Sequence, residues 1–144
     1  MALLRIERSV ALPATEAWRR LTRWEQHAAH VPLTRITVTT PGPTDAGTRF
    51  VARTGAGFAG FDDPMEVVRW QPPVEGHPGL CRLEKRGRII RGWAEIEVRP
   101  VGPGCQVVWR EELRVSRLPR FFDGLTSRVG NLVFGRAVTG LLRG

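Results

Sequence analysis

The chain has 144 residues, with 42% hydrophobic and 25% charged side chains, which is ordinary for a folded globular protein. Its length predicts one domain over residues 1–144, large enough for a real hydrophobic core, and argues against several domains. The formal net charge of +8 comes from 22 basic and 14 acidic residues, and Lys85 is the only lysine.

The arginines are spread along the whole chain. A basic surface attracts nucleic acid, anionic lipid or acidic ligands. However, arginines occur from Arg5 to Arg143, and the densest basic group surrounds one predicted turn. We therefore expect a solvated basic face and no specific nucleic-acid partner, and keep a binder of nucleic acid or anionic lipid as a low-ranked alternative. The densest group consists of Arg82, Lys85, Arg86, Arg88 and Arg91.

Cysteine content and hydropathy bear on the compartment. Cys81 and Cys105 are outside any CxxC motif and fall in predicted strands, so free buried thiols are expected. The first residues, Met-Ala-Leu-Leu, are followed at once by charges at Arg5, Glu7 and Arg8, unlike a signal peptide. No apolar run approaches the ~20 residues of a membrane span. We predict a cytoplasmic protein.

The first elements in chain order are a strand and two short helices. Residues 3–12 alternate between apolar and polar side chains, which predicts a half-buried strand. Pro13 suits the first turn of a helix that continues past Trp18. A second short helix is predicted over 24–29, before Pro32.

Six further strands are predicted, joined by turns rich in glycine and proline. Residues 55–60 are glycine-rich and are expected to form a loop or a strongly bent edge. Consecutive strands with short connections favour an antiparallel sheet. The predicted strands span 33–40, 48–54, 61–70, 80–85, 88–99 and 106–116.

The last segment, from Pro119 to about Arg143, predicts one long amphipathic helix. A strand hairpin that leads directly into such a helix can fold the helix back across its own sheet. The space between sheet and helix is then a natural place for an apolar ligand, and the fold class is α+β. The apolar residues at helical spacing are Phe122, Leu125, Val129, Leu132, Val133 and Leu141.

The element order and several strings resemble the START-like superfamily, also called the polyketide cyclase/dehydrase and lipid transport (SRPBCC) family. The likeness covers nearly the whole chain and is greatest to small single-domain members from high-GC actinobacteria. The matching strings are RIERSVALPATEAWRRLT at 5–22, GTRFVARTG at 47–55, DPMEVVRWQPP at 63–73 and KRGRIIRGWAEIEVRPVGPGCQVVWREELRV at 85–115.

This resemblance implies a helix-grip (START/Bet v 1-like) fold. Such a fold has a curved antiparallel sheet of six to seven strands, two short helices after the first strand, and the long C-terminal helix over the concave face. Family members bind lipids, sterols, polyketides or hormones in a deep pocket, and some cyclise or dehydrate aromatic polyketides. This chain has no tyrosine, so it lacks the Tyr that some cyclases place in the pocket. We expect no cofactor, and a monomer or homodimer.

Glu111 is the sharpest candidate for chemistry. It shares strand parity with the apolar Val107, Trp109 and Leu113, so it faces the concave side if that parity does. Burial beside an indole would raise the pKa of this carboxyl and make it a proton donor near neutral pH. A structural ion pair with an arginine such as Arg53, or a bulge that turns Glu111 outward, remains an alternative.

Other residues are predicted to form the pocket walls. Gly92 and Ala94 are small and lie on the inward parity of their strand, which leaves room for a ligand. Ordinary core packing is the alternative role for the larger residues. The predicted ligand-binding set is Phe50, Met65, Val67, Ile90, Gly92, Ala94, Trp109, Glu111, Phe122, Leu125 and Val129.

Metal and nucleophile motifs are weak. The carboxylates of Asp62, Asp63 and Glu66 lack a calcium-loop pattern, and His27 and His30 have no third ligand at metal spacing. No metal site is predicted.

The leading hypothesis is a carrier that binds a hydrophobic small molecule between sheet and helix, such as a lipid or polyketide. A cyclase or dehydratase that uses Glu111 as acid and base ranks second.

Overall fold

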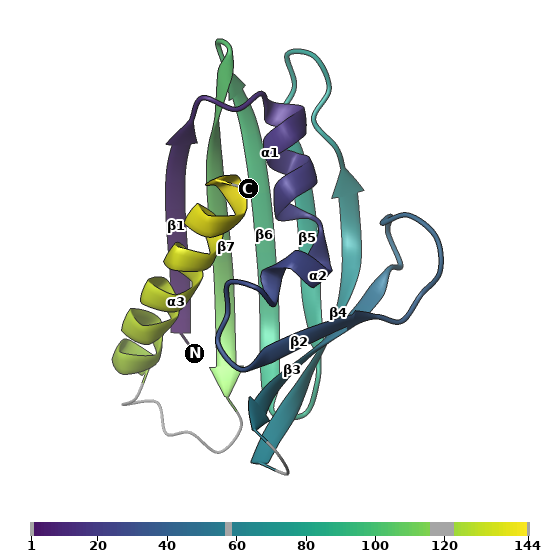
Figure 1. The fold of residues 1–144 in the computed structure, drawn as a ribbon, viewed down its shortest axis with the longest axis vertical. Helices are drawn as coiled ribbons and strands as arrows, with labels where there is room; N and C mark the ends of the chain where they lie inside the picture. The colour runs from purple at the N-terminus through teal and green to yellow at the C-terminus, as the bar shows by residue number, and fades with distance from the viewer. Residues whose placement is uncertain (1, 57–58, 116–122, 144) are drawn as a thin grey trace.

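The computed structural model describes residues 2–56, 59–115 and 123–143. Seven strands form one antiparallel sheet in the order β1-β7-β6-β5-β4-β3-β2. The predicted α+β helix-grip architecture is therefore confirmed (Figure 1). The elements are β1 (Ala2–Val10), α1 (Ala14–Leu21), α2 (Trp24–His27), β2 (Thr34–Val38), β3 (Arg49–Ala56), β4 (Ala59–Gln71), β5 (Gly79–Arg86), β6 (Ile90–Val101), β7 (Gly104–Val115) and α3 (Asp123–Arg143).

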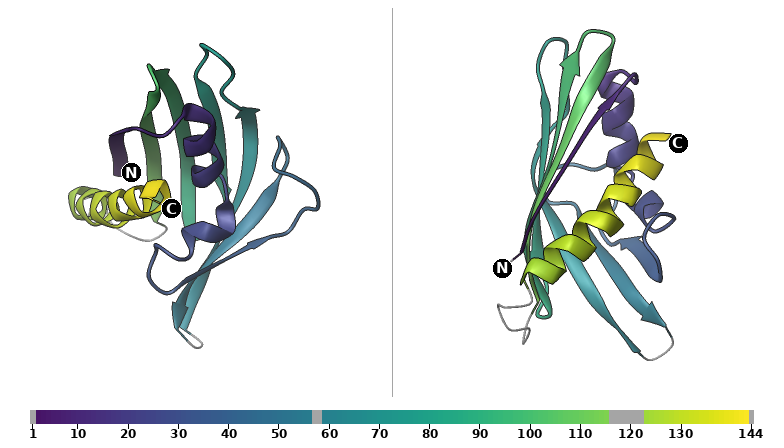
Figure 2. Two further views of the ribbon diagram at one scale, coloured as in Figure 1. Left: turned by 45° about the horizontal axis from the view of Figure 1, so that its top comes forward. Right: turned by 90° about the vertical axis from the view of Figure 1, so that its left-hand side faces the viewer.

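The sheet curls, and its helices lie together on the concave face (Figure 2). Helix α3 crosses diagonally over β1 and β7, while α1 and α2 lie over the middle of the sheet. Gly130 allows α3 to approach β1 closely, because a Cβ there would be 2.9 Å from the Leu4 side chain. The helices and the sheet thus enclose a shared interior.

Strand alternation sorts the side chains between the two faces. In β5, Cys81 and Leu83 are buried, while the alternate residues Arg82 and Glu84 face outward. The outer face carries cross-strand ion pairs, such as Arg82 with Glu95 and Arg110 Nη2 with Glu97 Oε2 at 3.1 Å. Arg82 and Arg110 are therefore paired with acidic side chains on this face. Both cysteines are buried and free, which confirms that prediction.

The core is shared among the helices. Trp18, Leu21 and Trp24 from α1 and α2 pack on the sheet together with Val138 and Leu141 near the end of α3. The sequence pattern predicts that the terminal helix is the main apolar partner that covers this face of the sheet. Two short helices share it because each carries large apolar side chains on its sheet-facing side.

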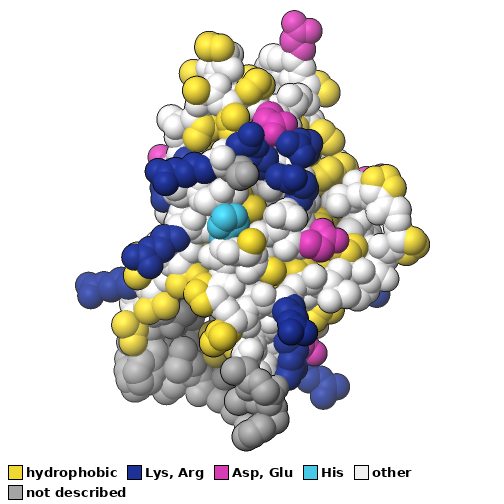
Figure 3. All heavy atoms as spheres, in the orientation of Figure 1, with side chains coloured by type: hydrophobic (Ala, Val, Ile, Leu, Met, Phe, Trp, Pro, Cys, Tyr) yellow, Lys and Arg dark blue, Asp and Glu magenta, His cyan; other side chains and the backbone are white. Residues whose placement is uncertain are grey.

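Only the second half of α3 uses an apolar face against the sheet. Leu125, Val129 and Leu132 are 59%, 53% and 56% exposed, contrary to the predicted buried stripe. Figure 3 shows hydrophobic side chains on the surface over the first turns of α3. The reason is geometric, because this end of the helix extends past the β1 edge of the sheet.

One boundary also differs from prediction. The β3–β4 ladder continues past the predicted strand ends, with Gly55 opposite Gly60 and Ala56 opposite Ala59. A Cβ at Gly60 would lie 2.7 Å from the Thr54 carbonyl oxygen, so the close strand pairing there requires glycine. Gly55 and Gly60 therefore belong to a tight strand pairing.

Candidate functional site

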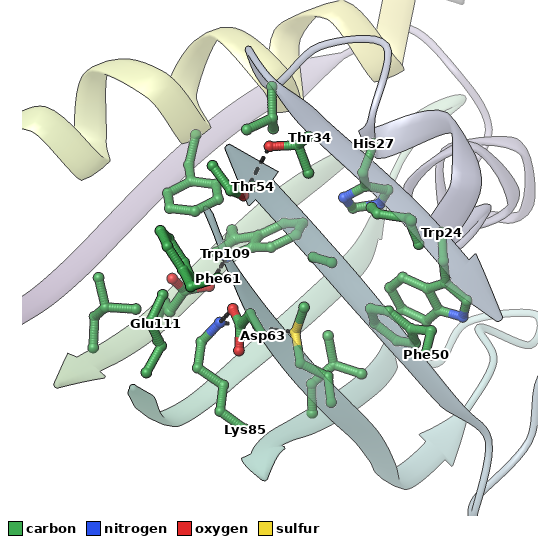
Figure 4. A pocket seen from close by; sticks show the side chains of 18 residues that line it. Trp24, His27, Thr34, Phe50, Thr54, Phe61, Asp63, Lys85, Trp109 and Glu111 are labelled. Atoms are coloured by element: carbon green, nitrogen blue, oxygen red, sulfur yellow. Dashed lines mark hydrogen bonds and ion pairs between the residues drawn. The ribbon is translucent and has the colours of Figure 1, made fainter. Parts of the chain in front are cut away.

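A cavity of about 240 Å³ lies between the concave face of the sheet and helices α2 and α3 (Figure 4). Its walls come from β2 to β7, α2, α3 and the segment between α2 and β2. Most of the lining is apolar or aromatic, as is typical of a small-molecule pocket. The lining residues are Trp24, His27, Val31, Thr34, Ile36, Phe50, Ala52, Thr54, Phe61, Asp63, Met65, Leu83, Lys85, Ile90, Trp109, Glu111, Leu113 and Phe134.

Aromatic rings hold the walls in place. Trp24 of α2 stacks on Phe50 of β3, with ring centroids 4.7 Å apart. Trp109 of β7 is nearly parallel to Phe134 of α3 at 6.5 Å and lies 5.7 Å from the His27 ring. Contacts of this kind fix the ring positions and link both helices to the sheet.

One part of the wall is polar and deeply buried. The Lys85 ammonium donates to Asp63 Oδ2 at 2.8 Å, and Lys85 Nζ also lies 3.8 Å from Met65 Sδ. The Trp109 indole N–H donates to Glu111 Oε1 at 3.4 Å. Asp63, Lys85 and Glu111 are only 8%, 9% and 3% exposed. We call these three residues the buried triad.

Strand register brings the buried triad together. Lys85 in β5 is paired with Met65 in β4, and Asp63 lies two residues from Met65 on the same face. Glu111 in β7 is paired with Ala94 in β6, and Ala94 is in turn paired with Leu83 in β5, two residues from Lys85. Three separate strands therefore deliver one ionisable group each to the same end of the cavity.

The protonation states follow from burial. Burial raises the pKa of Glu111, and the nearby Asp63 adds to this, while Lys85 and the Trp109 hydrogen bond oppose it. Burial alone would lower the pKa of Lys85, but the Glu111 and Asp63 carboxylates outweigh it, so the pKa is raised. The raised pKa favours the protonated form of Glu111, which lies beside the Lys85–Asp63 ion pair. The Glu111 carboxyl is then a proton donor held in an apolar wall.

His27 is a neutral wall residue. Burial lowers its pKa to about 4, against the opposing effect of its hydrogen bond to the Leu21 carbonyl. The His27 Nε2 lies 2.7 Å from that carbonyl oxygen and donates to it in the neutral ring. The ring therefore contributes no positive charge to the cavity at neutral pH.

The structure places five of the predicted site residues in the cavity wall and five others elsewhere. Phe50, Met65, Ile90, Trp109 and Glu111 line it, and Glu111 shares the inward face of β7 with Trp109. The alternative of an outward bulge at Glu111 is not realised, and the positive charge near it comes from Lys85, which forms its ion pair with Asp63.

Five predicted residues that the structure describes do not line the cavity. Val67 and Ala94 are packed in the hydrophobic core, and Leu125 and Val129 lie on the exposed side of α3. Gly92 has φ +133°, and a Cβ there would be 1.9 Å from the Glu112 carbonyl oxygen, so this glycine serves the backbone. Phe122 lies outside the described residues.

Sequence reasoning missed several wall residues, above all Asp63 and Lys85. Lys85 continues the inward parity of Cys81 and Leu83, so the alternation in β5 alone could have placed it inside. The charge of Lys85 favoured a surface position, because lysine is rarely fully buried. Trp24, His27 and Phe134 carried no signal that separates a cavity wall from an ordinary core.

The described residues offer no ready metal centre. Within 2–56, 59–115 and 123–143, no three histidine, cysteine or acidic side chains gather closely enough to hold an ion. In the same ranges, no helix is both long and apolar enough to cross a bilayer.

Comparisons with known proteins agree with this architecture. The model of the family described as polyketide cyclase / dehydrase and lipid transport matches residues 1–143. The structure of TTHA0849 from Thermus thermophilus is similar, with a TM-score of 0.76 and 18% identity, over 98% of this chain and 94% of that one. A STAR-related lipid transfer protein from Xanthomonas axonopodis gives a TM-score of 0.69 and 14% identity, over 96% and 84% of the two chains.

The Zhui aromatase/cyclase from Streptomyces sp. R1128 gives a TM-score of 0.62 and 13% identity, over 98% of this chain and 92% of that one. At such identities these structures show that the fold is shared and say nothing about activity. A search of curated proteins finds no significant match to the chain. The family match, in contrast, spans the sheet, the helices and the cavity between them, and the chain therefore belongs to the polyketide cyclase/dehydrase and lipid transport family.

Proposed function

We propose that the protein binds a small hydrophobic molecule in the cavity between its sheet and helices α2 and α3. The observation that carries this proposal is the cavity of about 240 Å³ itself, whose wall is largely aromatic and aliphatic. A close-packed core would leave no such volume. The family description, which includes lipid transport, supports the same class of function.

The cavity volume limits the ligand to a compact molecule. An apolar cavity of about 150 Å³ is large enough for benzene. At about 240 Å³, this cavity suits a molecule of two fused rings, or an aliphatic one of similar bulk. Naphthalene is therefore a suitable probe.

A cavity-filling variant tests the proposal. Ala52 is a small wall residue on β3, so Ala52→Phe places a large side chain in the cavity. Thr37→Phe adds the same side chain at an exposed position of the neighbouring strand β2 and is the matched control. In equilibrium dialysis, naphthalene is expected to bind the wild type and Thr37→Phe alike and Ala52→Phe at least ten times more weakly. Equal binding by all three proteins would contradict the proposal.

Acid–base catalysis is the second candidate function. Its support is Glu111, a buried carboxyl whose pKa is raised and which lies among aromatic wall residues beside Lys85. A protonated carboxyl in this position can protonate a carbonyl or a leaving hydroxyl and assist ring closure or loss of water. The absence of tyrosine leaves Glu111 as the main proton donor in this wall.

The test uses the compound extracted from purified Glu111→Gln protein, because an active wild type would already have converted it. Catalysis predicts that fresh wild-type protein converts this compound to a dehydrated or cyclised product, whereas folded Glu111→Gln binds it unchanged. Circular dichroism and thermal unfolding establish that the variant is folded. Return of the compound unchanged from both proteins would leave the carrier function and contradict catalysis.

A further inference from the structure

Several polar side chains in the cavity wall are already hydrogen-bonded to other protein groups. Thr34 and Thr54 share a hydrogen bond of 3.0 Å, and the Trp24 indole N–H donates to Thr44 Oγ1 at 3.2 Å. Trp109 donates to Glu111 and Lys85 donates to Asp63. Most of the wall therefore requires only apolar contact from a ligand.

Two buried oxygens in the triad lack a hydrogen-bond partner among the residues that the structure describes. They are Asp63 Oδ1 and Glu111 Oε2. A buried polar atom without a partner costs free energy, about 1–3 kcal/mol and more for a charged group. Figure 4 shows both carboxyl groups at the same end of the cavity, beside the Lys85 ammonium. This end of the cavity is thus chemically incomplete.

We infer that the ligand carries a neutral hydroxyl group, alcohol or phenol, which completes the hydrogen bonding of Asp63 and Glu111. The inference rests on the proposed function, because it assigns the polar end of the same apolar molecule. The hydroxyl group donates its hydrogen bond to Asp63 Oδ1, and the hydroxyl oxygen accepts one from the proton that Glu111 presents on Oε2. Trp109 already donates to Oε1, which leaves Oε2 as the oxygen that carries the proton.

Other head groups satisfy the triad less well. A carboxylate has no hydrogen to donate to Asp63 and adds a negative charge beside two acidic groups. An ammonium adds a second positive charge near Lys85, which is already neutralised by Asp63 at 2.8 Å. A ketone can accept from Glu111 but leaves Asp63 Oδ1 unpaired. A hydroxyl is both donor and acceptor and remains neutral.

A series of four probes with the same two-ring body tests the inference. The probes are naphthalene, 2-naphthol, 2-naphthoate and 2-(aminomethyl)naphthalene, each measured by equilibrium dialysis against the whole chain at neutral pH. 2-Naphthol is expected to bind at least about tenfold more tightly than naphthalene, because it forms a hydrogen bond to a charged acceptor. The naphthoate and the amine are expected to bind more weakly than 2-naphthol.

Two variants locate the preference within the cavity. Glu111→Met keeps side-chain length and removes both oxygens, so the naphthol-to-naphthalene preference is expected to fall at least about fivefold while naphthalene still binds. Thr54→Val removes a hydroxyl elsewhere in the same wall and is expected to keep the preference. The wild-type series decides the inference even if a variant does not fold.

The outcomes separate this inference from the proposed function. If naphthalene binds as tightly as 2-naphthol, or the naphthoate or amine binds most tightly, the hydroxyl assignment is wrong and apolar binding stands. The assignment is also wrong if folded Glu111→Met keeps the preference or Thr54→Val loses it. If none of the four probes binds, both the proposed function and the inference are overturned.

Discussion

Replacing Lys85 by methionine removes the buried ammonium and leaves its partner Asp63 without a counter-ion. The two side chains are 4% and 11% exposed, and the Nζ–Oδ2 distance is 2.8 Å. Removing one partner of such a buried pair costs about 3–5 kcal/mol, because a charge stays behind in an apolar environment. For a chain of this size, that free energy corresponds to a decrease in Tm of roughly 10–15 °C.

The assay is urea and thermal unfolding followed by circular dichroism. Arg86→Met is the matched control, because Arg86 is the next residue along β5 and forms exposed ion pairs with Glu84 and Glu66. The control is expected to lose no more than about 1 kcal/mol. The double variant Lys85→Met/Asp63→Leu replaces both charges by apolar groups and is expected to recover most of the lost stability.

The double-mutant cycle measures whether Lys85 and Asp63 stabilise each other. A coupling of about 2 kcal/mol or more between positions 85 and 63 is expected for a buried pair. If Lys85→Met costs no more than Arg86→Met, or the two substitutions at 85 and 63 are simply additive, the buried triad does not exist as described. The assignment of the polar end of the cavity would then lose its basis.

Single sites give three other predictions. The pKa of Glu111 is raised above its ordinary 4.5, so the folded state holds a proton that the unfolded state releases. The free energy of unfolding should therefore fall as pH rises from about that value through the folded pKa. Chemical denaturation at a series of pH values should show a weaker dependence of this free energy on pH in Glu111→Gln. Gly92→Ala should destabilise the protein by more than about 1 kcal/mol, because φ is +133° and the new Cβ would meet the Glu112 carbonyl. Gly124→Ala lies in open space on α3 and should stabilise the protein by up to about 1 kcal/mol. If Gly92→Ala leaves the free energy of unfolding unchanged, the strand geometry is wrong. Burial raises the pKa of Cys81 to about 12, so a thiol reagent should label it only on unfolding, and rapid labelling of the native protein would contradict its place in the core.

The sheet was predictable because alternation is a strong local signal. In β7, Val107 and Trp109 establish the inward parity, and Glu111 follows from them by counting two residues. The same rule in β5 also places Lys85 inside, after Cys81 and Leu83. Its charge concealed this, because the usual location of a lysine is the surface, and only the tertiary register shows that Asp63 lies within reach.

The face of α3 was not predictable from its own residues. Its apolar residues form one stripe through Leu125, Val129 and Leu132 and a second through Val138 and Leu141, although the predicted apolar set placed Leu141 with the first. Helical spacing treats both as buried faces. Which stripe meets the sheet depends on where the helix crosses β1, and that crossing is set by long-range packing. The cavity itself is equally non-local, because its walls come from most of the strands and two helices.

Native mass spectrometry of the purified protein, followed by organic extraction, tests the central claim most directly. We predict a stoichiometric adduct of a compact hydrophobic compound that carries a hydroxyl group, present in the wild type and in Thr37→Phe and absent from Ala52→Phe. If the wild type yields no adduct even after incubation with 2-naphthol, or Ala52→Phe retains the same adduct, the cavity is not a binding site for such a molecule.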